Sequence, residues 1–182
     1  MNQNDMNSVT IKNDLTQKYS KGNIVIHWAT AILILTLFPL GKHMTGLSAS
    51  EKIGLIKLHA ILGIIVFLLT LVRSYLFFKS KRPQGLITGS KFNDKLAVWI
   101  HNAFYFLLIG ISIAGLATMI SGGYVEALQS GTSDLILSKE NNKPLKAHGL
   151  LATLMIILLV LHVLGVIKHY VLTKENTLKR MS

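Results

Sequence analysis

Four long apolar blocks constrain this chain more than any other feature of its sequence. They cover residues 23–41, 55–78, 96–121 and 147–172, and each is close to the roughly 20 residues that a helix needs to cross a bilayer. Of all residues, 51% are hydrophobic and 15% are charged, whereas a soluble domain normally has about 25% charged residues. The sequence therefore predicts an all-α integral membrane protein, a four-helix bundle that forms one domain over residues 23–172.

The basic residues indicate how the chain is oriented. The net charge is +11, but the basic residues flank the apolar blocks, which favours lipid head groups over nucleic acid as their partner. Twelve Lys and Arg fall beside the two termini and the second connecting loop, against six beside the other two loops. We expect cytoplasmic tails at 1–22 and 173–182, and outward loops near 42–54 and 122–146. Residues 1–22 lack the apolar stretch of a signal peptide.

The chain has no cysteine. This excludes disulfides, iron–sulfur clusters and thiolate-bound haem, so any cofactor must be held by His, Met, carboxylate or backbone. The predicted spans also contain no Asp or Glu, which disfavours a di-iron carboxylate site and a proton relay.

Histidines are the residues that point to a function. Besides His169 near the end of the last span, five of the seven lie within or at the edge of a predicted span, where an ionisable side chain is costly and usually functional. Because consecutive spans run in opposite directions, position along a span gives depth in the membrane. By this measure two lie at outer depth and three at inner depth: His59 and His148 outside, His27, His101 and His162 inside.

The last span carries one histidine at each depth. His148 and His162 are 14 residues apart, which is about 21 Å and close to four helical turns, so both rings face one side. Two imidazoles suffice for a haem iron, whereas zinc usually needs three or four ligands. The spacing predicts two stacked b-type haems in the bundle core, with His59 pairing with His148. It leaves His27 and His101 equally available to His162.

Further polar residues lie at inner depth. Arg73, Lys168 and His169 either extend to the head groups or bind a haem propionate or a quinone carbonyl, with His169 able to pass a proton. His43 is expected to be solvated in an outer loop. Three glycines within about one turn of proposed ligands could admit a flat ring or let helices pack: Gly63, Gly149 and Gly165.

Several segments together resemble the bacterial cytochrome b561 family, which includes a membrane superoxide oxidase. They are YSKGNIVIHW, KLHAILG, LVRSYLFF, WIHNAFYFLLIGISIAG, AHGLLATLMIILLVLHVLGVIKHY and ENTLKRM, and they cover essentially everything after Lys18. No single segment is very specific to the family, but the order and spacing of the segments together are. The outer loops MTGLSASEK and GGYVEALQSGTSDLILSKENNK have no match in this pattern.

The resemblance implies two haem b groups, with His27 and His162 on the inner iron and His59 and His148 on the outer one. It also implies a bacterial inner-membrane oxidoreductase of the respiratory chain, passing electrons between an outer reactant and quinone. In the superoxide oxidase branch, superoxide gives its electron at the outer face and ubiquinone takes it near the inner haem. A mildly positive outer face, +2 by residue type, could steer that anion.

Two other functions remain open at this point. The chain could be the haem-carrying membrane anchor of a larger dehydrogenase, in which case it would purify with a soluble subunit. It could instead be a small haem-free transporter whose histidines bind a metal or relay protons, although the absence of carboxylates in the spans counts against this.

Overall fold

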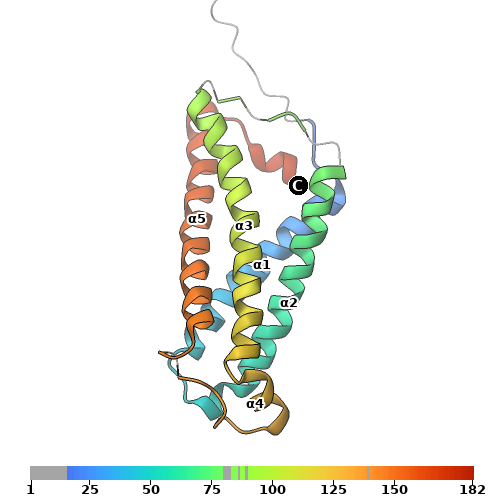
Figure 1. Cartoon of the computed structure of the whole chain (residues 1–182). Coiled ribbons are helices and arrows are strands. Elements are labelled where there is room, and N and C mark those ends of the chain that lie inside the picture. Colours follow the sequence, from blue (N-terminus) through green and yellow to red (C-terminus); the bar gives the residue numbers. More distant parts are fainter. Residues whose placement is uncertain (1–15, 80–82, 86, 89, 139) are drawn as a thin grey trace, which may run out of the picture.

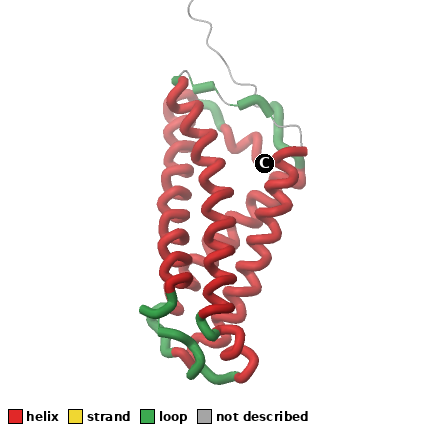
Figure 2. Tube along the Cα trace, viewed as in Figure 1, coloured by secondary structure: helices red, strands yellow, loops and turns green. Residues whose placement is uncertain are grey.

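The computed structural model describes residues 16–79, 83–85, 87–88, 90–138 and 140–182, which form an all-helical structure (Figures 1 and 2). The helices are α1 (Lys21–Met44), α2 (Ala49–Lys79), α3 (Lys91–Ser121), α4 (Tyr124–Ser130), α5 (Lys143–Thr173) and the 3-10 helix η2 (Thr177–Met181). Four of them, α1, α2, α3 and α5, are long and apolar enough to cross a membrane. Each predicted span lies within one of these four helices, which extend a few residues beyond it.

Polar side chains fix where the long helices begin. The Ser20 hydroxyl accepts a hydrogen bond from the Asn23 backbone N–H over 3.4 Å, and Ser90 accepts one from Asn93 over 3.4 Å. Asn142 caps α5 more closely, because its Oδ1 accepts from the Leu145 N–H over 3.0 Å. Such caps satisfy N–H groups that have no partner within the helix.

The long helices pack as two pairs joined in the middle. Helix α3 packs against α5, α1 packs against α2, and α2 joins the pairs by packing against α3. In Figure 1, α5, α3 and α2 stand side by side, and α1 runs obliquely behind them. Helices α1 and α5, both fully described, are not packed extensively against each other.

The buried apolar core is a thin layer halfway along the bundle. It consists of Val66, Leu108 and Met155. Met155 lies seven residues from both His148 and His162 along α5. Many other large apolar side chains of the long helices are exposed, as expected where lipid surrounds the protein. The layer therefore divides the bundle into two halves, each with its own histidines.

The short helix α4 closes one end of the bundle, which we call the loop end (Figure 1). It begins after Gly123, whose φ of 74° is a left-handed conformation that favours glycine. A Cβ at Gly123 would also run into the backbone of Leu135. Tyr124 is buried at the start of α4, and this burial raises the pKa of its hydroxyl. Helix α4 packs against α3 and α2.

The opposite end, which we call the tail end, carries the start of α1 and the C-terminus. Residues 173–182 were expected to form only a tail, but the structure folds Thr177–Met181 into η2 against the bundle. Figure 1 shows this segment crossing from the end of α5 towards the ends of α1 and α2. Residues 1–15 of the expected N-terminal tail lie outside the described residues.

Candidate haem-binding site

At the loop end, the structure brings His59 of α2 and His148 of α5 together. Their ring centroids are 6.0 Å apart with an angle of 73° between the planes. Two imidazoles bound to opposite sides of one iron would have centroids about 6 Å apart, since a metal–nitrogen bond is about 2 Å long and the ring centre lies about 1 Å beyond. The pair therefore fits one metal ion between two rings.

The hydrogen bonds of the His148 ring suit a ligand role. Its Nδ1 lies 2.9 Å from the Ile111 carbonyl oxygen of α3. If Nδ1 carries the proton and donates it to this carbonyl, Nε2 keeps a free lone pair for a metal. The His59 Nδ1 is buried without a hydrogen-bond partner, which is costly unless something satisfies it.

Glycines of the neighbouring helices lie directly against this pair. A Cβ at Gly41 of α1 would be 3.3 Å from Cε1 of His59, and a Cβ at Gly115 of α3 would be 3.2 Å from Cε1 and Nδ1 of His148. Both distances are tighter than ordinary van der Waals contact. These two glycines let the helices approach the rings, and sequence reasoning missed them.

The three glycines that the sequence singled out behave differently. A Cβ at Gly63, Gly149 or Gly165 would meet nothing within 4 Å. The structure therefore gives no support to the idea that they allow helix packing. Their sequence distance from a histidine was short, whereas Gly41 and Gly115 reach the histidines only through the tertiary fold.

At the tail end, three histidines and one arginine gather. His27, His101, His162 and Arg73 are close enough for electrostatic interaction. The rings of His101 and His162 have centroids 5.3 Å apart, at 87° to each other. The Nδ1 of His27 is buried without a partner. All three histidines predicted at inner depth thus lie in one half of the bundle, opposite His59 and His148.

His101 differs from the other histidines of its group. Its side chain is exposed, and its Nδ1 lies 2.6 Å from the Ala97 carbonyl oxygen of its own helix. His162 also contacts Phe104 edge to face, with centroids 5.5 Å apart. The His101 ring is therefore exposed and lies edge to face against the His162 ring.

The remaining predicted residues occupy different positions, Arg73 and Lys168 at the tail end and His43 at the loop end. The Arg73 guanidinium lies over the Tyr105 ring, 5.6 Å from its centre. Lys168 is exposed. His43, expected in a loop, is in the last turn of α1 and is exposed as predicted.

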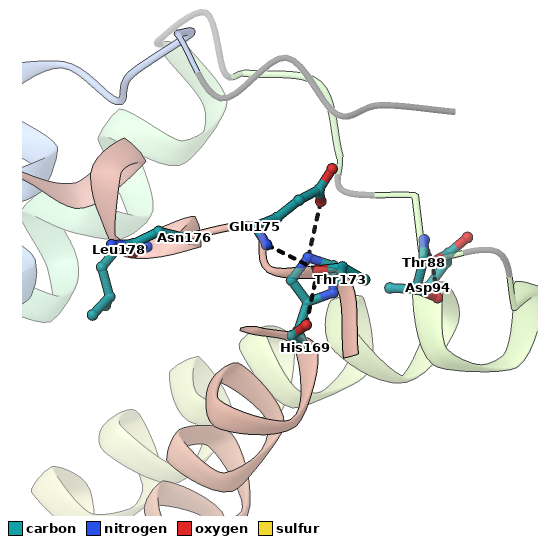
Figure 3. A network of polar contacts seen from close by, with 7 residues as sticks. All are labelled: Thr88, Asp94, His169, Thr173, Glu175, Asn176 and Leu178. Atoms are coloured by element: carbon teal, nitrogen blue, oxygen red, sulfur yellow. Dashed lines mark hydrogen bonds and ion pairs between the residues drawn. The ribbon is translucent and has the colours of Figure 1, made fainter. Parts of the chain in front are cut away.

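His169 has a carboxylate partner that sequence reasoning missed. Its Nε2 is 3.1 Å from Oε2 of Glu175, just beyond α5 (Figure 3). The Thr173 hydroxyl links the two residues, since it donates to the His169 carbonyl over 2.8 Å and accepts from the Glu175 N–H over 3.2 Å. Nearby, Asp94 accepts two hydrogen bonds from Thr88 in a separate cluster.

The available donors fit haem better than a metal held by several side chains. Among the described residues, no group of three or more His, Asp or Glu could hold a metal ion. Paired imidazoles, and a ring nitrogen held by a backbone carbonyl as at His148, are instead what a six-coordinate haem iron requires.

The fold and the site together define the class of protein, which is a four-helix membrane protein with histidines gathered in both halves of its bundle. The family model of prokaryotic cytochrome b561 matches residues 18–182. The chain therefore belongs to the prokaryotic cytochrome b561 family. It is 28% identical over 173 residues to cytochrome b561 homolog 2 of Escherichia coli (strain K12), covering 91% of each chain.

Family membership confirms the prediction, made from the sequence segments, that the chain is a cytochrome of the bacterial b561 family. Proteins of this family generally bind haem b, and membership implies electron transfer in a membrane.

Proposed function

We propose that this chain is a di-haem b-type membrane cytochrome that carries electrons across the membrane between an outer-face reactant and the quinone pool. The observation that carries the proposal is the placement of histidines in both halves of one bundle, with His148 and His162 on the same helix. We propose superoxide as the outer reactant, and a bacterial inner membrane as the location.

Four histidines would hold the two haems. His59 and His148 would bind the haem of the loop end, and His27 and His162 that of the tail end. Haem b supplies a one-electron redox centre when bound.

The choice of His27 over His101 rests on two arguments. His27 matches the family pattern, and its buried Nδ1 has no partner within the protein. His101 is exposed and lies edge to face against the His162 ring. We therefore assign His101 to the surroundings of the haem, where it helps to orient the His162 ring.

Charged groups at the tail end would serve the cofactor and the quinone. Arg73 is near both His27 and His162, so its guanidinium suits a haem propionate. Lys168, which is exposed, would bind a propionate or a quinone carbonyl. Reduction of one quinone to quinol takes two electrons and two protons. The electrons come from two superoxide ions, which become two O₂. His169 and Glu175 form a hydrogen-bonded pair that can deliver those protons.

A spectrum of the purified protein tests the haem assignment. The reduced-minus-oxidised difference should show b-type bands, with two haems per chain. His148→Ala should remove the loop-end haem, and His43→Ala should remove none because His43 is exposed in the last turn of α1. A wild-type protein without a b-type spectrum, or a His148→Ala protein with two haems, would overturn the proposal.

Activity measurements then test the reactants. Superoxide generated outside sealed vesicles should reduce quinone in their membrane, and the rate should fall when both haems are removed. Purification under mild conditions should yield this chain alone. A soluble flavin or iron–sulfur subunit that purifies with it would instead support the membrane-anchor function.

A further inference from the structure

The C-terminal segment makes a set of hydrogen bonds that the proposed electron transfer does not explain. The Nε of Arg180 donates to the Gln17 carbonyl over 3.1 Å, and its Nη2 donates to the Gln84 carbonyl over 2.6 Å. The Tyr19 N–H donates to the Arg180 carbonyl over 3.1 Å. Arg180 is only 5% exposed, so these bonds are shielded from water and hold η2 firmly.

A fourth bond connects η2 to the candidate site. The indole Nε1 of Trp28 in α1 donates to the Met181 carbonyl over 2.9 Å. The Trp28 ring also contacts the ring of His27, with centroids 5.4 Å apart and planes at 81°. The C-terminus is therefore linked through one side chain to a proposed haem ligand.

The helix packing explains why such a link matters. His27 is on α1 and His162 is on α5, and these two helices are not packed extensively against each other. Since η2 follows α5 in the chain and is bonded to α1, it ties the two helices together at the tail end. The separation of the two histidines then depends on this tie.

We propose that η2 is a clip that positions His27 opposite His162, with Trp28 and Arg180 as its positioning residues. This inference rests on the proposed function, because it assigns the clip to the haem of the tail end. The clip consists of Thr177–Met181, Trp28 and the backbone of residues 17–19 and 84. It does not touch His59 or His148, so its influence is confined to one haem.

Redox titration of the intact cytochrome tests the clip. Trp28→Phe keeps the ring beside His27 but removes the bond to Met181, and a second variant ends the chain after Asn176. Both should shift the midpoint potential of the tail-end haem, or lower the haem content from two per chain towards one. The loop-end haem should titrate as in the wild type. The matched control is Trp99→Phe, which changes a tryptophan of α3 that is 74% exposed and should alter neither haem.

Two results would overturn the proposal. One is wild-type potentials and haem content in both the Trp28→Phe and the shortened protein. The other is an equal loss of both haems in Trp28→Phe, which would mean that the bond supports the whole fold. If the shortened chain fails to accumulate, Trp28→Phe alone decides.

A test without haem separates this inference from the proposed function. Because the chain has no cysteine, Lys18→Cys with Lys179→Cys should be joined by a short bifunctional maleimide, since these exposed residues adjoin the Tyr19–Arg180 bond. Lys18→Cys with Lys146→Cys, at the opposite end of α5, should not be joined. Cross-linking in a protein that binds no haem would refute the proposed function but would support the clip. Haem binding without cross-linking would refute the clip.

Discussion

At the scale of single residues, Gly115 decides how closely α3 approaches His148. Gly115→Ala would place a Cβ 3.2 Å from two atoms of the His148 ring, so the ring must shift by a few tenths of an ångström. Crowding of a packed site typically costs about 1–3 kcal/mol, which corresponds to roughly a 5- to 150-fold loss of affinity. We expect Gly115→Ala to weaken binding of the loop-end haem, as measured by haem retention during dilution.

A second glycine of the same helix provides the control. A Cβ at Gly110 would lie 3.5 Å from a methyl group of Leu151, which is an ordinary contact with a flexible side chain. Gly110→Ala should therefore keep both haems. Equal haem retention in the two alanine variants would show that the approach of α3 does not limit the site.

Comparison of two histidines tests the assignment at the tail end. His27→Ala should remove one of the two haems, because it deletes a proposed haem ligand. His101→Ala should keep both haems and change only the potential of one, because we propose that His101 lies beside the ligand His162 and is not itself a ligand. Haem content and redox titration measure both effects. Loss of haem in His101→Ala with retention in His27→Ala would reverse the assignment.

At the scale of elements, the start of α5 fixes the position of His148. Asn142 is 1% exposed, and its bond to the Leu145 N–H caps the helix six residues before the histidine. Loss of an N-cap costs about 1 kcal/mol. Asn142→Ala should therefore lower the thermal midpoint and release the loop-end haem before the tail-end haem on heating.

The cap of α3 offers a comparison for this effect. Ser90 is at the tail end and caps through a longer bond of 3.4 Å, so Ser90→Ala should destabilise less and without preference for the loop-end haem. Haem absorbance recorded during heating resolves the order in which the two haems are lost. The same order of loss in both variants would show that the Asn142 cap has no local role.

At the scale of the whole molecule, the sequence predicts the features that depend on a single helix, namely its hydropathy and the spacing of residues along it. Hydropathy located the four long helices, and the 14-residue spacing of His148 and His162 followed from helix geometry. The sequence could not indicate the contacts of Gly41, Gly115 and Glu175, because these depend on which helices become neighbours. Nor could it indicate η2, whose short sequence acquires structure from bonds to residues 17, 28 and 84.

The orientation of the whole bundle is the remaining large-scale prediction. The excess of Lys and Arg around the tail end predicts that both termini are cytoplasmic and that α4 faces outward. Single cysteines can report this, because the chain contains none. In intact bacterial cells a membrane-impermeant maleimide should label Ser130→Cys, in α4, but should label Ser182→Cys only after the cells are opened. The reverse pattern would put the haem of His59 and His148 on the cytoplasmic side. It would then exclude an external superoxide donor at that haem, because the anion would have to cross the apolar core to reach it.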